Sequence, residues 1–125
     1  MRILAISDEV VRWMYSPALR ERVGEIDLVI SCGDLPIYYL EYIASSLNAP
    51  CAYVRGNHDQ YEIGANGLIK THPGGWQPLD MERHVMAGLA LGGLDGCLRY
   101  NQDAPYQYSQ REQWLRPSCP GVQID

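Results

Sequence analysis

Three short apolar segments, with two helical patterns between them, constrain the fold of this chain more than any other feature. The apolar segments are residues 2–7, 27–32 and 51–54. They are short, and the first two are rich in β-branched residues, as is typical of buried strands. Residues 17–23 and 36–47 have helical patterns. The order strand, helix, strand, helix, strand with short connections predicts an α/β fold that starts as a βαβαβ unit of parallel strands.

Local signals support each predicted helix. Ser16, Pro17 and Gly24 are suited to the N-cap, the first position and the end of the first helix. A third helix over residues 109–115 is predicted by a capping box of Ser109 and Glu112. In the second helix the apolar residues fall on one face: Ile37, Leu40, Ile43, Ala44 and Leu47.

The character of the chain changes after Asp59. Residues 61–78 are rich in Gly, Pro and Asn, which predicts a long loop. Residues 85–87 and 89–91 are short apolar segments around Gly88, which predicts a tight hairpin.

Polar residues follow each predicted strand. Asp8 follows the first strand, Asp34 the second, and Asn57 with His58 the third. Because the carboxyl ends of parallel strands share one edge of the sheet, these side chains are expected to converge there. Carboxylate and amide oxygens suit Mn, Fe, Zn or Mg, and an Asp on the middle loop, Asp34, could bridge two ions.

Residues beside these ligands suggest further roles. In the same cleft, His58 could protonate a leaving oxygen, and Asp59 could orient His58 or make only a structural hydrogen bond. Arg55 could reach a phosphate or form a salt bridge. The tyrosines at positions 38, 39 and 42 could form a substrate platform, although packing is the commoner role of such residues.

The motifs resemble those of the calcineurin-like metallophosphoesterase superfamily. The resemblance rests on Asp8 after a strand, Gly33-Asp34, and residues 56–59 with the sequence Gly-Asn-His-Asp. It implies the N-terminal half of a metallophosphoesterase-type α/β/β/α sandwich and a site with two divalent metal ions. The resemblance further implies that Asp8 binds the first ion, Asp34 bridges both, Asn57 binds the second, and His58 assists the leaving group. A weaker resemblance covers residues 93–101, followed by Gln107-Tyr108, which are similar to a Gly-rich hairpin and loop of some bacterial members.

Two departures from the family pattern stand out. Val10 occupies a position where the family usually has a histidine ligand. No Gly-His-x-His motif follows downstream. His72 is interpreted as a loop residue in solvent, and His84 as a surface or edge-strand residue. Residues 1–125 are therefore expected to form a partial domain without its C-terminal half. Such a domain would have an exposed sheet edge through which it could self-associate.

Charge and cysteine spacing exclude several classes of function. The net charge is -5, and the 10 Lys and Arg residues are scattered, which argues against a polyanionic nucleic-acid partner. A small phosphate ester remains compatible, because bound metal ions would supply positive charge. No apolar stretch is long enough for a membrane span. The sequence contains no Cys-x-x-Cys pair, so a zinc ribbon is not expected. Cys32 and Cys51 are expected to be buried, and the protein is expected to be cytoplasmic with reduced thiols.

Three hypotheses follow from the sequence. The first is a metal-dependent phosphatase or phosphodiesterase. The second is an incomplete or non-catalytic metal-binding relic of such an enzyme, which another chain could complete. A nucleotide-binding module without hydrolysis is the third, and it is disfavoured because the first loop has neither Gly-x-Gly-x-x-Gly nor a P-loop Lys.

Overall fold

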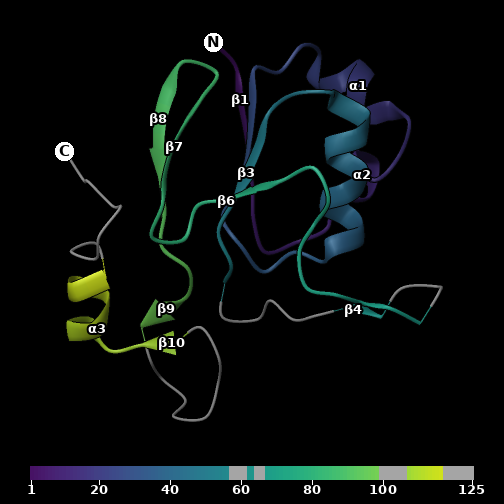
Figure 1. Cartoon of the computed structure of the whole chain (residues 1–125). Helices are drawn as coiled ribbons and strands as arrows, with labels where there is room; N and C mark the ends of the chain where they lie inside the picture. Colours follow the sequence, from purple (N-terminus) through teal and green to yellow (C-terminus); the bar gives the residue numbers. More distant parts are fainter. Residues whose placement is uncertain (57–61, 64–66, 99–106, 117–125) are drawn as a thin grey trace.

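The structure, a computed structural model, describes residues 1–56, 62–63, 67–98 and 107–116. Its main sheet has four parallel strands in the order β1-β2-β3-β6. They are β1 (Ile3–Ile6), β2 (Leu28–Ser31), β3 (Cys51–Tyr53) and β6 (Gln77–Pro78). The carboxyl ends of β1, β2 and β3 meet at one edge of the sheet, the lower edge in Figure 1. The predicted α/β fold with a parallel βαβαβ start is confirmed.

Helices α1 (Ala18–Val23) and α2 (Ile37–Leu47) lie on one side of this sheet, and a hairpin lies on the other (Figure 1). The predicted end signals are confirmed in part: Gly24 is the C-cap as predicted, whereas the N-cap is Pro17, one residue after the predicted Ser16. The hydroxyl of Ser16 accepts a hydrogen bond from Ala18 N at 3.3 Å, and Gly24 ends α1 with a φ of 67°. A short 3₁₀ helix, η1 (Arg12–Met14), precedes α1.

The core lies between the sheet and these two helices. The strands contribute Ile6, Val29, Cys51 and Tyr53, and the helices contribute Leu19, Tyr39, Leu40 and Ile43. Complete burial of a Leu or Ile side chain stabilises the fold by roughly 1.5–3 kcal/mol. The predicted apolar face of α2 is therefore the face that holds this helix on the sheet. Tyr39 packs in the core, as the packing interpretation of the tyrosine group expects.

The prediction of one long loop over residues 61–78 is wrong. Strands β4 (Glu62–Ile63) and β5 (Ile69–Lys70) pair antiparallel, and β6 joins the main sheet beside β3. Buried Trp76 fixes the chain here, because its indole N–H donates to Leu40 O at 2.7 Å. Pro78 is tolerated because β6 is an edge strand, where a missing N–H leaves no ladder bond unmade.

The predicted hairpin and the predicted third helix are confirmed. Strands β7 (Arg83–Met86) and β8 (Leu89–Gly92) pair antiparallel around a turn in which Ala87 and Gly88 both have positive φ. After β9 (Cys97–Leu98) and β10 (Gln107–Tyr108), which pair parallel, comes α3 (Gln110–Leu115). Both hydrogen bonds of the capping box between Ser109 and Glu112 are present.

Cys32 and Cys51, both expected in the core, differ in their exposure to solvent. Cys51 is buried, and burial raises the pKa of its thiol to about 11. Cys32 is exposed, so its predicted burial is wrong. Alternation along the chain explains the difference, since Ser31 at the end of β2 points inward and the next residue therefore points outward. Within the described residues, none of the helices has the length and apolarity needed to cross a bilayer.

Candidate metal centre

The first polar loop presents Asp8 directly after β1. Asp8 has a φ of 68°, in the left-handed region that residues other than Gly rarely adopt. Its backbone N–H donates to Gly33 O at 3.2 Å, and the hydroxyl of Ser7 donates to its carboxylate. A strained backbone held by a neighbouring loop is a common feature of functional sites.

The second loop presents Asp34 in the same way after β2. Asp34 has a φ of 61°, and Gly33 before it has a φ of 101°. Gly33 lies against the third loop, which follows β3 and contains Gly56. A Cβ built on Gly33 would be 2.7 Å from Gly56 Cα and closer still to Gly56 N. Only glycine fits this crossing of two backbones, which brings the second and third loops into contact.

Gly56 makes room for the carboxylate of Asp34. A Cβ built on Gly56 would lie 2.7 Å from Asp34 Oδ2 and closer still to Oδ1 and Cγ. The carboxylate therefore occupies the space that a side chain at position 56 would need. Together with the hydrogen bond from Asp8 to Gly33, this contact joins the Asp8, Asp34 and Gly56 segments at one edge of the sheet.

The remaining predicted site residues, Asn57, His58 and Asp59, lie outside the described residues, so their roles stay predictions. Across the part of the chain that the structure describes, no group of three or more His, Cys, Asp or Glu residues is placed to hold a metal ion. The oxygen donors that are described, on Asp8 and Asp34, are nevertheless of the type that hard divalent cations prefer. The space left by Gly56 allows the Asp34 carboxylate to sit between two loops, so the described residues fit a metal site.

The position that lacks the family histidine is solvent-exposed. Val10 lies two residues after Asp8 and is 36% exposed. Of the two other histidines, His72 is exposed, and its Nδ1 lies 2.5 Å from Arg55 Nη2. His84 lies in β7 and pairs with Glu82 at 2.7 Å. The predicted solvent position of His72 is confirmed, whereas His84 is half-buried and occupies an edge-strand position in the two-stranded β7–β8 sheet.

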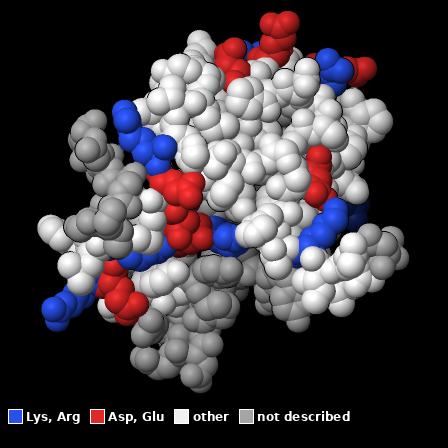
Figure 2. Space-filling model, in the orientation of Figure 1, with Lys and Arg blue, Asp and Glu red and all other residues white. Residues whose placement is uncertain are grey.

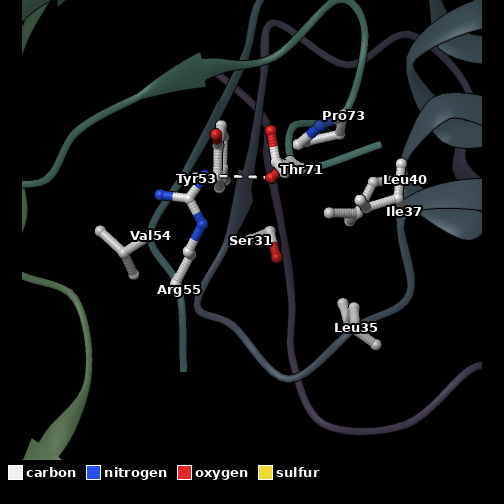
Figure 3. Close-up of a pocket in the computed structure, with 9 residues that line it drawn as sticks. All are labelled: Ser31, Leu35, Ile37, Leu40, Tyr53, Val54, Arg55, Thr71 and Pro73. Carbon is white, nitrogen blue, oxygen red and sulfur yellow. Dashed lines mark hydrogen bonds between the residues drawn. The ribbon is translucent and has the colours of Figure 1, made fainter. Parts of the chain in front are cut away.

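Arg55 forms a salt bridge, which is one of the two roles that the sequence allowed for it. Its Nη1 lies 3.6 Å from Asp95 Oδ2, and its Nη2 donates to Thr71 O at 3.1 Å. Figure 3 shows the guanidinium at the rim of a small pocket, with a dashed line to Thr71. The pocket lies at the carboxyl ends of β2 and β3 and is lined by Ser31, Leu35, Ile37, Leu40, Tyr53, Val54, Arg55, Thr71 and Pro73.

Asp95 is the residue at this edge to which sequence reasoning assigned no role. It is buried, with 4% of its surface exposed, and Oδ1 accepts a hydrogen bond from Arg55 N at 2.7 Å. Burial raises the pKa of the Asp95 carboxyl, while the hydrogen bond from Arg55 lowers it. In the sequence, Asp95 is visible only as an acidic residue in a Gly-rich segment. This pattern does not reveal that its partner, Arg55, is 40 residues away.

An aromatic group adjoins the Asp34 loop. The ring of Tyr15 makes edge-type contacts with Tyr38 and Tyr42, with centroids 5.5 and 4.8 Å apart. Tyr38 remains exposed, whereas Tyr39 is completely buried. Packing therefore accounts for most of the tyrosine group that the sequence presents after Asp34.

Comparison with models of protein families identifies a family. The family model described as calcineurin-like phosphoesterase matches residues 1–117. Neither the curated proteins nor the solved structures give a significant match.

Proposed function

The chain belongs to the calcineurin-like phosphoesterase family, and on this premise we propose that it hydrolyses phosphate esters with two divalent metal ions at the carboxyl ends of β1, β2 and β3. One observation carries the proposal. The Asp8 loop is bonded to the Asp34 loop, and the Asp34 carboxylate fills the space above Gly56, where the Gly-Asn-His-Asp segment begins. Asp8 and Asp34 both have positive φ on these adjoining loops, and metal binding would explain why two carboxylates are held side by side at this edge.

Each residue of the proposed site has a distinct role. Asp8 would hold the first ion, Asp34 would contribute to holding both, and Asn57 would hold the second. The ions, drawn from Mn, Fe, Zn and Mg, would supply an activated water and neutralise the charge that develops on the phosphate. The Ser7 hydroxyl fixes the Asp8 carboxylate by donating to it. His58 donates a proton to the leaving oxygen, and Asp59 orients the imidazole of His58.

A small phosphate ester is the substrate class that the charge distribution favours. On the face in Figure 2, basic residues lie singly or beside acidic ones instead of forming one patch. The chain as a whole carries a net charge of -5. The positive charge that a phosphate requires would therefore come mainly from the bound ions.

Hydrolysis of p-nitrophenyl phosphate and of bis(p-nitrophenyl) phosphate tests the proposal. We expect turnover that depends on added Mn²⁺ and that is abolished by Asp34→Asn and strongly reduced by His58→Ala. Asp27→Asn is the matched control, because Asp27 precedes β2 at the opposite end of the sheet and accepts a hydrogen bond from Arg2 N. Absence of metal-stimulated turnover, or turnover that survives Asp34→Asn, would overturn the proposal.

A second candidate function is metal binding without catalysis, by a relic of such an enzyme or by a chain that another polypeptide completes. The specific observation in its favour is Val10, which offers no donor beside Asp8. Fewer ligands mean weaker retention of an ion, and β1, an edge strand with exposed Ile3, offers a surface for association. Elemental analysis after gel filtration separates the cases. Two tightly held ions in a monomer would exclude the relic.

A further inference from the structure

We propose that Asp95 is a positioning residue of the metal site, which holds the third loop in the place where it can bind an ion. The inference rests on the proposed function, because it concerns the same site. Asp95 does not belong to any of the three loops. It follows the β7–β8 hairpin and reaches the site through the backbone of Arg55.

Two consecutive residues hold both backbone polar groups of Arg55. Asp95 Oδ1 accepts from Arg55 N at 2.7 Å, and Gly96 N donates to Arg55 O at 2.7 Å. Asp95 Oδ2 also lies 3.6 Å from Arg55 Nη1, so backbone and side chain of one residue are anchored together. A peptide segment held on both sides in this way has little freedom to shift.

Arg55 lies next to the proposed metal-binding segment, so holding Arg55 in place also affects that segment. Arg55 directly precedes Gly56, whose Cα faces the Asp34 carboxylate, and Gly56 directly precedes Asn57. Fixing Arg55 therefore fixes the contact between the second and third loops and the point from which Asn57 and His58 depart. Displacement of an active-site group by about 1 Å can cost about 100-fold in activity, so an anchor at this point matters.

Asp95 is itself held by residues from other segments. Its N–H donates to Asp80 Oδ1 at 2.8 Å, and its carbonyl accepts from Arg116 Nη1 at 2.8 Å. Arg116 also pairs with Asp80 through Nη2, and Gln113 Nε2 donates to the Asp95 carbonyl at 3.3 Å. A buried carboxylate is costly, and a well-packed apolar residue often stabilises a fold as well or better. Stability alone therefore does not explain a buried aspartate at position 95, whereas positioning of the third loop does.

The chain contains a matched control for this anchor. Asp27 Oδ2 accepts from Arg2 N at 2.7 Å, which is the same kind of bond at the same length. It lies at the amino ends of β1 and β2, away from the metal-site edge of the sheet. Asp27→Ala therefore removes a backbone-to-carboxylate bond of the same length, from an exposed position, without touching the proposed site.

The test is Mn²⁺ binding to the full metal-free chain by calorimetry, with wild type, Asp95→Ala, Asp95→Asn and Asp27→Ala. We expect Asp95→Ala to raise the Mn²⁺ dissociation constant roughly 10- to 100-fold, the usual effect of losing an outer-shell partner. Asp95→Asn keeps an oxygen that accepts from Arg55 N, so it should restore most of the affinity. Asp27→Ala should leave the dissociation constant unchanged. Equal affinity in folded Asp95→Ala and wild type would overturn the inference, and a wild type that binds no Mn²⁺ would overturn the proposed function with it.

Amide hydrogen exchange keeps the inference testable if Asp95→Ala does not fold. In wild type without metal, the Arg55 amide should exchange slowly, because Asp95 accepts its hydrogen. Asp95→Leu, which has a similar shape and no acceptor, should accelerate exchange at Arg55 and weaken Mn²⁺ binding together. Fast exchange at Arg55 in wild type, or unchanged Mn²⁺ binding in Asp95→Leu, would contradict the role of Asp95.

Discussion

Replacing Gly56 by alanine probes the contact between the second and third loops. The backbone of Gly56 is not in the left-handed region, so alanine causes no conformational strain there. The new Cβ would instead lie 2.7 Å or less from the Asp34 carboxylate, which must retreat by at least about 0.7 Å to reach an ordinary contact of 3.4 Å. Because Asp34 is the proposed bridging ligand, the substitution moves a metal ligand without removing it.

The expected magnitude follows from that displacement. Misplacing an active-site group by about 1 Å can cost about 100-fold, and losing an outer-shell partner costs 10- to 100-fold in metal affinity. We therefore expect Gly56→Ala to raise the Mn²⁺ dissociation constant by roughly 10- to 100-fold, or about 1.4–2.7 kcal/mol. The matched control is Gly92→Ala, because a Cβ there meets Glu82 O at an unstrained 3.6 Å and no other atom of the described residues within 4 Å.

A double-mutant cycle on stability checks the physical reason. Overpacking usually costs about 1–3 kcal/mol, and Gly56→Ala should show such a cost in urea unfolding of the metal-free protein. In an Asp34→Ala background the carboxylate is gone, so most of that cost should disappear. An equal cost in both backgrounds would refute the steric argument, and so would wild-type Mn²⁺ affinity in Gly56→Ala.

Three further predictions concern the core and its titrating groups. Ile43→Ala, at a fully buried position, should lower the free energy of unfolding by about 2–5 kcal/mol in urea denaturation; a loss well below 1 kcal/mol would contradict the proposed core. In the native protein, peptide mapping after brief iodoacetamide treatment at pH 8 should find Cys32 labelled and Cys51 unlabelled, because Cys51 is buried with a pKa raised to about 11. Labelling of both at the same rate would contradict the burial of Cys51. The raised pKa of Asp95 means that the folded state binds its proton more tightly than the unfolded state, so this group favours folding most at low pH. Relative to Asp95→Asn, the unfolding free energy of wild type should therefore fall as pH rises from 3.8 through the raised pKa, and a rise over that range would contradict the assigned direction.

The main parallel sheet could be predicted from the sequence largely because its signals are local. Strands β1, β2 and β3 each coincide with a short apolar run that ends at a Gly or Asp. The second helix carries a periodic apolar face, and the capping box of the third is a contact within one turn. Each of these patterns is determined by neighbours in the chain, so one sequence is sufficient to find them.

The parts that could not be predicted depend on contacts between distant residues. Strand β6 has two residues, one of them Pro78, and it is held in place by Trp76 against the carbonyl of Leu40. The anchor of Arg55 on Asp95 likewise joins segments that no local pattern connects. Exposure of Cys32 depends on where β2 ends, and a shift of one residue reverses which side chain points inward.

The site was predictable to the extent that topology determines it. Parallel strands place their carboxyl ends together, and the hydrogen bond from Asp8 to Gly33 confirms that the first two loops meet. The glycines in the motifs were also informative, since Gly33 lies where two loop backbones cross and Gly56 leaves room for the Asp34 carboxylate. The detailed roles of Asp8, Asp34 and residues 57–59 remain predictions that solution experiments must test.

Calorimetric titration of Mn²⁺ into the metal-free chain, compared with Asp34→Asn, tests most directly whether the three loops form a metal centre. Asn preserves the shape of the Asp34 side chain and removes its charge. The wild type should bind Mn²⁺ with measurable heat and saturation, and Asp34→Asn should lose most of that binding while its thermal unfolding stays cooperative. Binding of equal strength in both proteins, or no binding in the wild type, would contradict the assignment of these loops as a metal site.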